Sequence, residues 1–227
     1  MVASAEEERH SSPMFDWKGH LRGRFIVFDG PDGSGKSTQI DRFTTWCAEH
    51  DVPLEIVREP GGTPIGEAIR RVLLDPAHEE MTIRTEMLLY MASRAQLVRE
   101  RIQPAIQAGR MVLADRFISS TLAYQGTAGG LDTEEILEVG RVATDGVEPD
   151  LIVLFDVDAA TGLSRISGTK DRMEQKSSAF HDRVREGYRS QAIRDPERYL
   201  VVDASQSEDD VFDALMRGLE AHITVRT

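Results

Sequence analysis

The sequence predicts an α/β fold in three layers, with a five-stranded parallel sheet flanked by helices on both faces. Two observations lead to this prediction. Short apolar runs alternate with longer amphipathic stretches, which is typical of strands that are buried on both faces and joined by helices. Each apolar run also ends in a polar residue or glycine. Because parallel sheets bind ligands beyond the carboxyl ends of their strands, we expect the chemistry to lie along that one edge.

The individual elements follow from local patterns. Apolar or aromatic residues recur every three positions at Ile40, Phe43 and Trp46, a helical spacing. Pro104 should kink or interrupt the longest helical region, and Gly109 should end it. The expected strands are 24–30, 54–60, 110–116, 149–158 and 198–205, and the expected helices are 36–50, 65–75, 84–109 and 207–223, the last opened by a capping box of Ser207 and Asp210.

Length, composition and net charge indicate the domain organisation and argue against some classes of binding partner. We expect residues 23–227 to form a single domain and residues 1–22, which are polar and lack an apolar signal core, to form a flexible extension. The net charge of −12 argues against a nucleic acid polymer as partner. No apolar run is long enough for a membrane span. The lone Cys47 cannot form an internal disulfide, which favours a reducing, cytoplasmic location.

The strongest motif is "GPDGSGKST" at residues 30–38, between the first strand and the first helix. It matches G-x-x-x-x-G-K-[ST], whose backbone N–H groups surround phosphate oxygens at a helix N-terminus. We therefore expect a P-loop NTPase fold in which Lys36 reaches the β- and γ-phosphates of ATP and Ser37 ligates Mg²⁺. The alternative is a chance match in which the glycines serve a tight turn. The predicted ATP-binding residues are Gly30, Pro31, Asp32, Gly33, Ser34, Gly35, Lys36, Ser37 and Thr38.

The class of enzyme is narrowed by what accompanies this loop. A GTPase needs the guanine-specifying N-K-x-D, which this sequence lacks, and motors and large ATPases usually need a longer chain. A single domain with a phosphate loop and a second basic pocket favours a small-molecule kinase.

Four segments after the phosphate loop carry a more specific resemblance. "REPGGT" (58–63), "LLYMASRAQLV" (88–98), "ADRFISSTLAYQG" (114–126) and "DRMEQ" (171–175) occur in this order. With the loop, they closely resemble bacterial thymidylate kinases over about residues 24 to 222. The resemblance implies transfer of the ATP γ-phosphoryl group to dTMP, with Mg²⁺, in dTTP biosynthesis. It also implies a homodimer.

The resemblance assigns the acceptor phosphate to Arg58 and Arg116, each at the end of a predicted strand. Their planar guanidinium groups suit a phosphate that carries nearly two negative charges. For Arg58 the alternative is a salt bridge with Glu59 or another neighbour. Asp115 is placed to orient the attacking oxygens or to bind Mg²⁺ with Ser37.

The resemblance assigns the nucleoside to residues of the second and third segments. Tyr90 and Arg94 are four apart and so share a helical face; the family role is stacking on thymine for the aromatic ring and a hydrogen bond to the base for the arginine. The alternative is a core tyrosine with a surface arginine. The remaining assignments are Tyr124 near the deoxyribose, Gln125 beside it as a substrate-binding residue, and Asp32 near the acceptor's 3′-hydroxyl and phosphate. Ser120 and Thr121 could reach the base edge; the alternative is that they only start a helix.

A short lid at about residues 163–178 should bring positive charge to the transferred group. Some members of the family carry an arginine in the phosphate loop, where this chain has Ser34. The catalytic charge is therefore expected from Arg165 and Arg172, with Lys170 as a further lid cation or a solvated one. Two rival functions stay open: a kinase for another acceptor, and a nucleotide-binding protein that has lost turnover.

Overall fold

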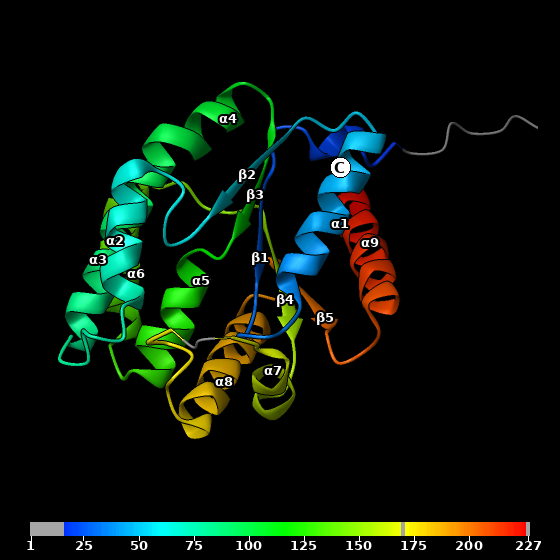
Figure 1. Ribbon diagram of the computed structural model, residues 1–227. Coiled ribbons are helices and arrows are strands. Elements are labelled where there is room, and N and C mark those ends of the chain that lie inside the picture. The colour runs from blue at the N-terminus through cyan, green and yellow to red at the C-terminus, as the bar shows by residue number, and fades with distance from the viewer. Residues whose placement is uncertain (1–15, 169–170, 226–227) are drawn as a thin grey trace, which may run out of the picture.

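The computed structural model describes residues 16–168 and 171–225. Within these ranges a parallel sheet of five strands, in the order β2-β3-β1-β4-β5, lies between two layers of helices (Figure 1), which confirms the predicted α/β fold. The strands are β1 (Phe25–Asp29), β2 (Leu54–Arg58), β3 (Met111–Asp115), β4 (Leu151–Asp156) and β5 (Tyr199–Asp203). The helices are η1 (Gly19–Leu21), α1 (Lys36–Glu49), α2 (Pro64–Leu74), α3 (Ile83–Leu97), η2 (Val98–Ile102), α4 (Gln103–Gln107), α5 (Ile118–Thr121), η3 (Leu122–Ala128), α6 (Thr133–Thr144), α7 (Ala159–Arg165), α8 (Ser178–Arg194) and α9 (Glu208–Val225).

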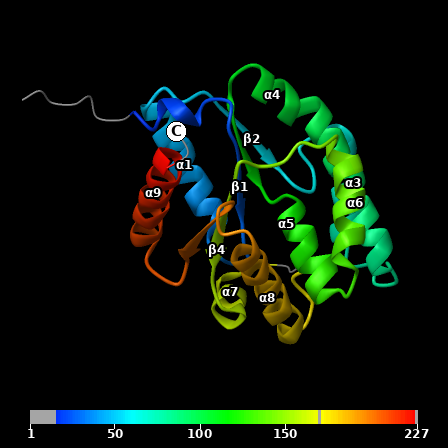
Figure 2. The same ribbon diagram turned by 180° about the vertical axis from the view of Figure 1, so that it is seen from behind.

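The central strand β1 is buried on both faces. Phe25 and Val27 pack into a core cluster with residues of α3, η2 and α4. Ile26 and Phe28 alternate with them and pack into a second cluster with residues of α1 and α9. Figures 1 and 2 show the same division, with α1 and α9 on one side of the sheet and α3, α4 and α6 on the other. Each such side chain, fully buried, stabilises the fold by about 1.5–3 kcal/mol.

The strand register brings the polar strand ends to one edge. Asp115 at the end of β3 pairs with Phe28 of β1 and with Arg58 of β2. On the other side of β1, Asp29 pairs with Leu154 of β4. The helices α7 and α8 lie beyond this edge (Figure 1). The predicted site residues at the strand ends are therefore collected at one edge of the sheet.

The N-terminal boundary predicted at residue 22 is wrong. Trp17 and Leu21 are 8% and 0% exposed and belong to the core cluster of α1 and α9. The Trp17 ring stacks on Trp46, with 5.3 Å between the ring centroids. Burial of these two apolar side chains fixes residues 17–21 on the domain; residues 1–15 lie outside the described residues.

The longest predicted helix, 84–109, is interrupted before Pro104 rather than at it. The α-helix α3 ends at Leu97, and η2 follows as a π-helical turn in which the Gln103 N–H donates to the Val98 carbonyl. Pro104 then lies in the first turn of α4, where its missing N–H is not required. Gly109 ends the helix as expected, with a φ of 70°. Ser207 caps the last helix as predicted, since the Asp210 N–H donates to Ser207 Oγ over 3.2 Å; the Ser207 hydroxyl in turn donates to Asp210 Oδ2 over 2.6 Å.

Candidate active site

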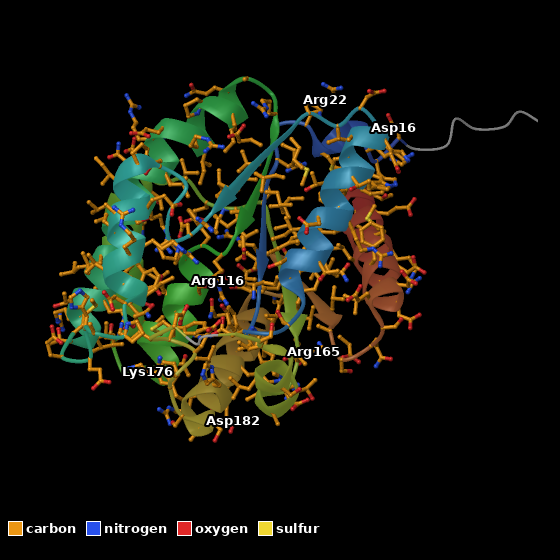
Figure 3. All side chains as sticks on the ribbon, in the orientation of Figure 1. Asp16, Arg22, Arg116, Arg165, Lys176 and Asp182 are labelled. Carbon is orange, nitrogen blue, oxygen red and sulfur yellow. The ribbon has the colours of Figure 1, made fainter. Side chains whose placement is uncertain are left out.

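A cavity of about 810 Å³ opens at the carboxyl edge of the sheet. It is lined from the phosphate loop, the end of β3, α3, η3, the end of α7 and the start of α9. Figure 3 shows Arg116 beside α5 and Arg165 on α7, both at this edge of the sheet. The predicted site residues that line the cavity are Asp32, Gly33, Ser34, Gly35, Lys36, Ser37, Thr38, Tyr90, Asp115, Arg116, Ser120, Thr121, Tyr124, Gln125 and Arg165.

The phosphate loop has the predicted strand–loop–helix context. Gly35 caps α1 in the left-handed region, with a φ of 81°, where a side chain would strain the backbone. Gly33 has a φ of 72°, and a Cβ atom there would lie 1.9 Å from the Gly162 carbonyl oxygen of α7. These two positions therefore need glycine. The loop ends at the N-terminus of α1, where unpaired N–H groups and the helix dipole attract anions.

Lys36 is buried against its own loop. Its ammonium Nζ donates to the carbonyls of Gly30 and Pro31 over 3.0 and 3.1 Å and lies 3.4 Å from Ser34 Oγ. Burial and the nearby charge of Arg116 lower its pKa to about 8. Gly30 and Pro31 do not line the cavity; they hold the lysine from behind.

Arg116 is the centre of the charged cluster beyond the loop. Its Nη2 lies 2.5 Å from Asp32 Oδ1, and the Tyr124 hydroxyl donates to Asp32 Oδ2 over 2.7 Å. Burial alone would raise the pKa of Asp32, but the charges of Arg116 and Lys36 bring it below its ordinary value. Arg116 has a φ of 73°, a conformation that costs a non-glycine residue about 1–3 kcal/mol. Strain of this kind persists where surrounding contacts fix it.

Those contacts come from Asp29 and the residues bound to it. Asp29 is fully buried at the end of β1. It accepts hydrogen bonds from Ser119 Oγ (2.6 Å), Ser120 Oγ (2.8 Å) and the Tyr188 hydroxyl (2.6 Å). Arg116 Nη1 in turn donates to Ser120 Oγ and the Tyr188 hydroxyl, each over 3.1 Å. The network holds the guanidinium towards the phosphate loop.

Arg94 lies behind the wall of the cavity instead of lining it. It is 1% exposed, and its Nε donates to Glu59 Oε2 over 2.7 Å. Its Nη2 donates to Thr121 Oγ1 over 3.2 Å. Both Glu59 and Thr121 line the cavity. Burial raises the pKa of Glu59 to about 7, against the opposing effect of Arg94.

Arg58 is placed differently from the prediction. It does not line the cavity; half-exposed, it forms an ion pair with Glu67, with 2.7 Å between Nη2 and Oε1. This is the alternative that the sequence left open, with Glu67 as the neighbour. Arg70, one turn along α2 from Glu67, lines the cavity instead and donates to the Pro60 carbonyl over 2.9 Å. The single sequence offers no signal that separates Arg70 from Arg71 beside it.

The two lid arginines lie in different places. Arg165 lines the cavity, and its Nη1 donates to the Ala204 carbonyl over 2.9 Å. Arg172 is 5% exposed and does not line it; its Nε donates to the Leu73 carbonyl over 2.8 Å. Arg172 was expected to supply catalytic charge from the lid; in this structure the Leu73 carbonyl of α2 and Glu86 of α3 hold its side chain instead. Lys170 lies outside the described residues.

Oxygen ligands that fit Mg²⁺ stand beside Lys36. Asp115 Oδ1 is buried and makes no hydrogen bond to any residue in the described part of the chain. Both Asp115 and Ser37 line the cavity. A carboxylate and a hydroxyl next to a phosphate loop are a donor set that suits this hard cation, which uses one or two protein oxygens together with phosphate oxygens.

Besides Arg70, three functional groups of the site were missed by sequence reasoning. Asp29 was noted only as a polar strand end, and Glu59 only as a neighbour of Arg58. Tyr188 lies on α8, 72 residues after Arg116. Nothing in the sequence marks that long-range contact.

Comparisons with known proteins point to one family. A family model described as thymidylate kinase matches residues 28–215. The chain is 47% identical to a thymidylate kinase of Geobacillus sp. (strain WCH70) over 196 residues, 85% of this chain and 93% of that protein. It is 45% identical to thymidylate kinases of Lactobacillus delbrueckii subsp. bulgaricus, over 203 residues (87% and 95% of the two chains), and of Deinococcus radiodurans, over 192 residues (84% and 93%).

Proposed function

The chain belongs to the thymidylate kinase family, and on that premise we propose that its cavity binds ATP and dTMP together and transfers the γ-phosphoryl group, giving ADP and dTDP for dTTP synthesis. One observation carries the proposal. A complete phosphate loop and the charged cluster around Arg116 open into the same cavity of about 810 Å³. The donor and acceptor phosphates can therefore meet inside one site, as direct transfer requires.

The donor occupies the end of the cavity at the phosphate loop. The loop N–H groups and Lys36 hold the triphosphate, whose oxygens give the ammonium a direct anionic partner in addition to the nearby carboxylates. Adenine lies near residues 203–205, where Ala204, Gln206 and Ser207 line the cavity. Ser37 and Asp115 would hold Mg²⁺, which neutralises charge on the phosphate oxygens when bound.

The acceptor occupies the other end. Arg116 and Arg70 line the cavity and carry the charge for the dTMP phosphate. Asp32, held by Arg116 and Tyr124, lies where it can accept from the sugar 3′-hydroxyl. The Tyr90 ring stacks on the base, a contact worth about 1–3 kcal/mol. Ser120, Thr121 and Gln125 complete the wall, with Arg94 acting through Glu59 and Thr121.

Catalysis then consists of alignment and charge neutralisation. An oxygen of the dTMP phosphate attacks the γ-phosphorus while the bond to the ADP oxygen breaks, so no covalent enzyme intermediate is needed. Lys36 and Arg116 are fixed before the reaction, and preorganised donors of this kind stabilise the developing charge without reorganisation. Arg165 is the lid arginine that lines the cavity, and we assign it the remaining positive charge.

The test is coupled ADP release from Mg·ATP with a panel of acceptors: dTMP, dUMP, UMP, dCMP, dGMP and dAMP. We expect the highest turnover with dTMP and weak turnover with UMP. Lys36→Met should abolish turnover and leave dTMP binding measurable. Turnover that is highest with another nucleotide would overturn the acceptor assignment, and full activity of Lys36→Met would overturn the role of the loop.

We also propose a homodimer and a cytoplasmic location. Large apolar side chains are exposed on adjacent helices of the protomer: Ile65 (55%) and Val72 (42%) on α2, and Leu88 (49%) on α3. An apolar surface of this kind suits a second copy of the chain. The described residues contain no helix that is long and apolar enough to cross a membrane. Sedimentation should show a dimer, and Leu88→Glu should weaken it.

A further inference from the structure

Glu86 is a buried carboxylate below the base end of the cavity that the proposed mechanism does not use. It is 1% exposed and lies on α3. Tyr90 and Arg94 follow it at intervals of four residues, so the three side chains share one helical face. A buried carboxylate is costly unless it is paired and hydrogen-bonded. The partners of Glu86 therefore indicate what it does.

Each carboxylate oxygen of Glu86 has a different partner. Arg172 Nη2 lies 2.6 Å from Oε2. This contact is an ion pair, since Nη2 makes no aligned hydrogen bond. Gln125 Nε2 donates to Oε1 over 2.7 Å. The turn at 171–174 thus occupies one oxygen of Glu86 and leaves the other for Gln125.

This second contact fixes which way the Gln125 amide points. A carboxylate beside an arginine has only acceptors, so the amide must turn its NH₂ group towards Glu86. The amide oxygen Oε1 is then directed away from Glu86, and no hydrogen bond to it forms within the described ranges. Gln125 is 1% exposed, yet it lines the cavity. The reversed amide would set two acceptor oxygens against each other, so the environment strongly favours one orientation.

We propose that Glu86 is a positioning residue that makes Gln125 a hydrogen-bond acceptor towards the base and so selects a pyrimidine with an N3–H donor. This inference rests on the proposed binding of dTMP. Thymine carries a hydrogen at N3, whereas N3 of cytosine is itself an acceptor. Gln125 Oε1 satisfies the first and opposes the second. Discrimination by hydrogen bonding to a buried group is larger than discrimination by shape.

The test compares the affinities of dTMP and dCMP by calorimetry in the full-length protein, for the wild type and Glu86→Gln. A glutamine at this position presents both a donor and an acceptor, so the Gln125 amide can adopt either orientation. We expect the ratio of the dCMP to the dTMP dissociation constant to fall at least tenfold, and the ratio of the two kcat/KM values to fall with it. The matched control is Glu135→Gln, which removes the ion pair of Arg84 with Glu135, between α3 and α6 and outside the cavity. Its ratio should equal that of the wild type.

A merely structural role would weaken both nucleotides alike, so an unchanged ratio in Glu86→Gln overturns the inference. The double variant Glu86→Gln/Gln125→Glu covers the case in which the single variant does not fold. In this variant the glutamine at 86 donates to the carboxylate at 125 and accepts from Arg172, which restores an acceptor at the cavity wall. A preference for dTMP in the folded double variant supports the inference, and its loss contradicts it. Failure of the wild type to bind or phosphorylate dTMP would instead refute the proposed function.

Discussion

Replacement of Lys36 by methionine should change how the stability of the protein depends on pH. The pKa of Lys36 is lowered from 10.5 to about 8 by burial and Arg116. Below pH 8 Lys36 is charged in both the folded and the unfolded protein, so the folded state carries the full cost of burying that charge. Between pH 8 and 10.5 the folded protein has released this proton while the unfolded chain still holds it. Stability rises with pH wherever the unfolded state binds more protons, by about 1.4 kcal/mol per pH unit for one group.

The wild type should therefore gain about 1 kcal/mol in free energy of unfolding relative to Lys36→Met between pH 7 and pH 9. Hydrogen bonds from Lys36 to Gly30 and Pro31 are lost in the variant, but that loss adds a constant and cancels in the comparison of the two pH values. Urea titration followed by fluorescence of the two tryptophans measures the difference. The control variant Lys176→Met, at an exposed position, should show the same change in free energy of unfolding between the two pH values as the wild type. If the free energies of unfolding of Lys36→Met and of the wild type change equally between the two pH values, the reasoning is refuted.

Three further predictions concern buried groups. Arg94→Ala should lower the free energy of unfolding by about 3–5 kcal/mol because it leaves Glu59 buried without its partner. The double variant Arg94→Leu/Glu59→Leu should recover most of that loss in urea titrations, but it should not recover dTMP binding. Tyr188→Phe removes a hydroxyl that bonds Asp29 over 2.6 Å; we expect a loss of about 1–3 kcal/mol with a lower kcat, and unchanged values would contradict the assigned network. Burial raises the pKa of Cys47 to about 12, so a thiol reagent should modify it only as fast as the protein unfolds; rapid labelling of the native protein would exclude this.

The fold was largely predictable because its signals are local. Wholly apolar runs identify buried parallel strands, and the residues after them identify the edge that carries the site. The N-terminal segment shows the limit of this approach. Residues 17–21 have no periodic pattern, and Trp17 is ordered by stacking on Trp46, which is 29 positions away. A contact between two aromatic rings so far apart in the chain leaves no trace in either segment.

The site was predictable where the backbone geometry requires a particular residue. It was less predictable where a long side chain can reach several possible partners. The phosphate loop needs glycine at defined positions, and those positions can be read directly. Arg58 and Arg172 were both expected at phosphates, yet the first pairs with Glu67 and the second with Glu86. An arginine side chain reaches several acceptors from one backbone position. Its partner is decided by which carboxylate the fold brings near, and a single sequence does not give that.

The carboxylates around the cavity are better explained by orientation than by stability. Three arginines are held by buried or partly buried acids: Arg116 by Asp32 and Asp29, Arg94 by Glu59 and Arg172 by Glu86. Apolar replacements of buried ion pairs are often neutral or stabilising, so stability alone does not account for them. A planar guanidinium that is held on one side presents its remaining N–H groups in a fixed direction. Fixed donors favour the transition state because no reorganisation is needed at the moment of reaction. Of these three arginines only Arg116 lines the cavity, so Asp32 and Asp29 serve the anionic substrates by aiming its guanidinium, whereas Arg94 and Arg172 lie behind the cavity wall.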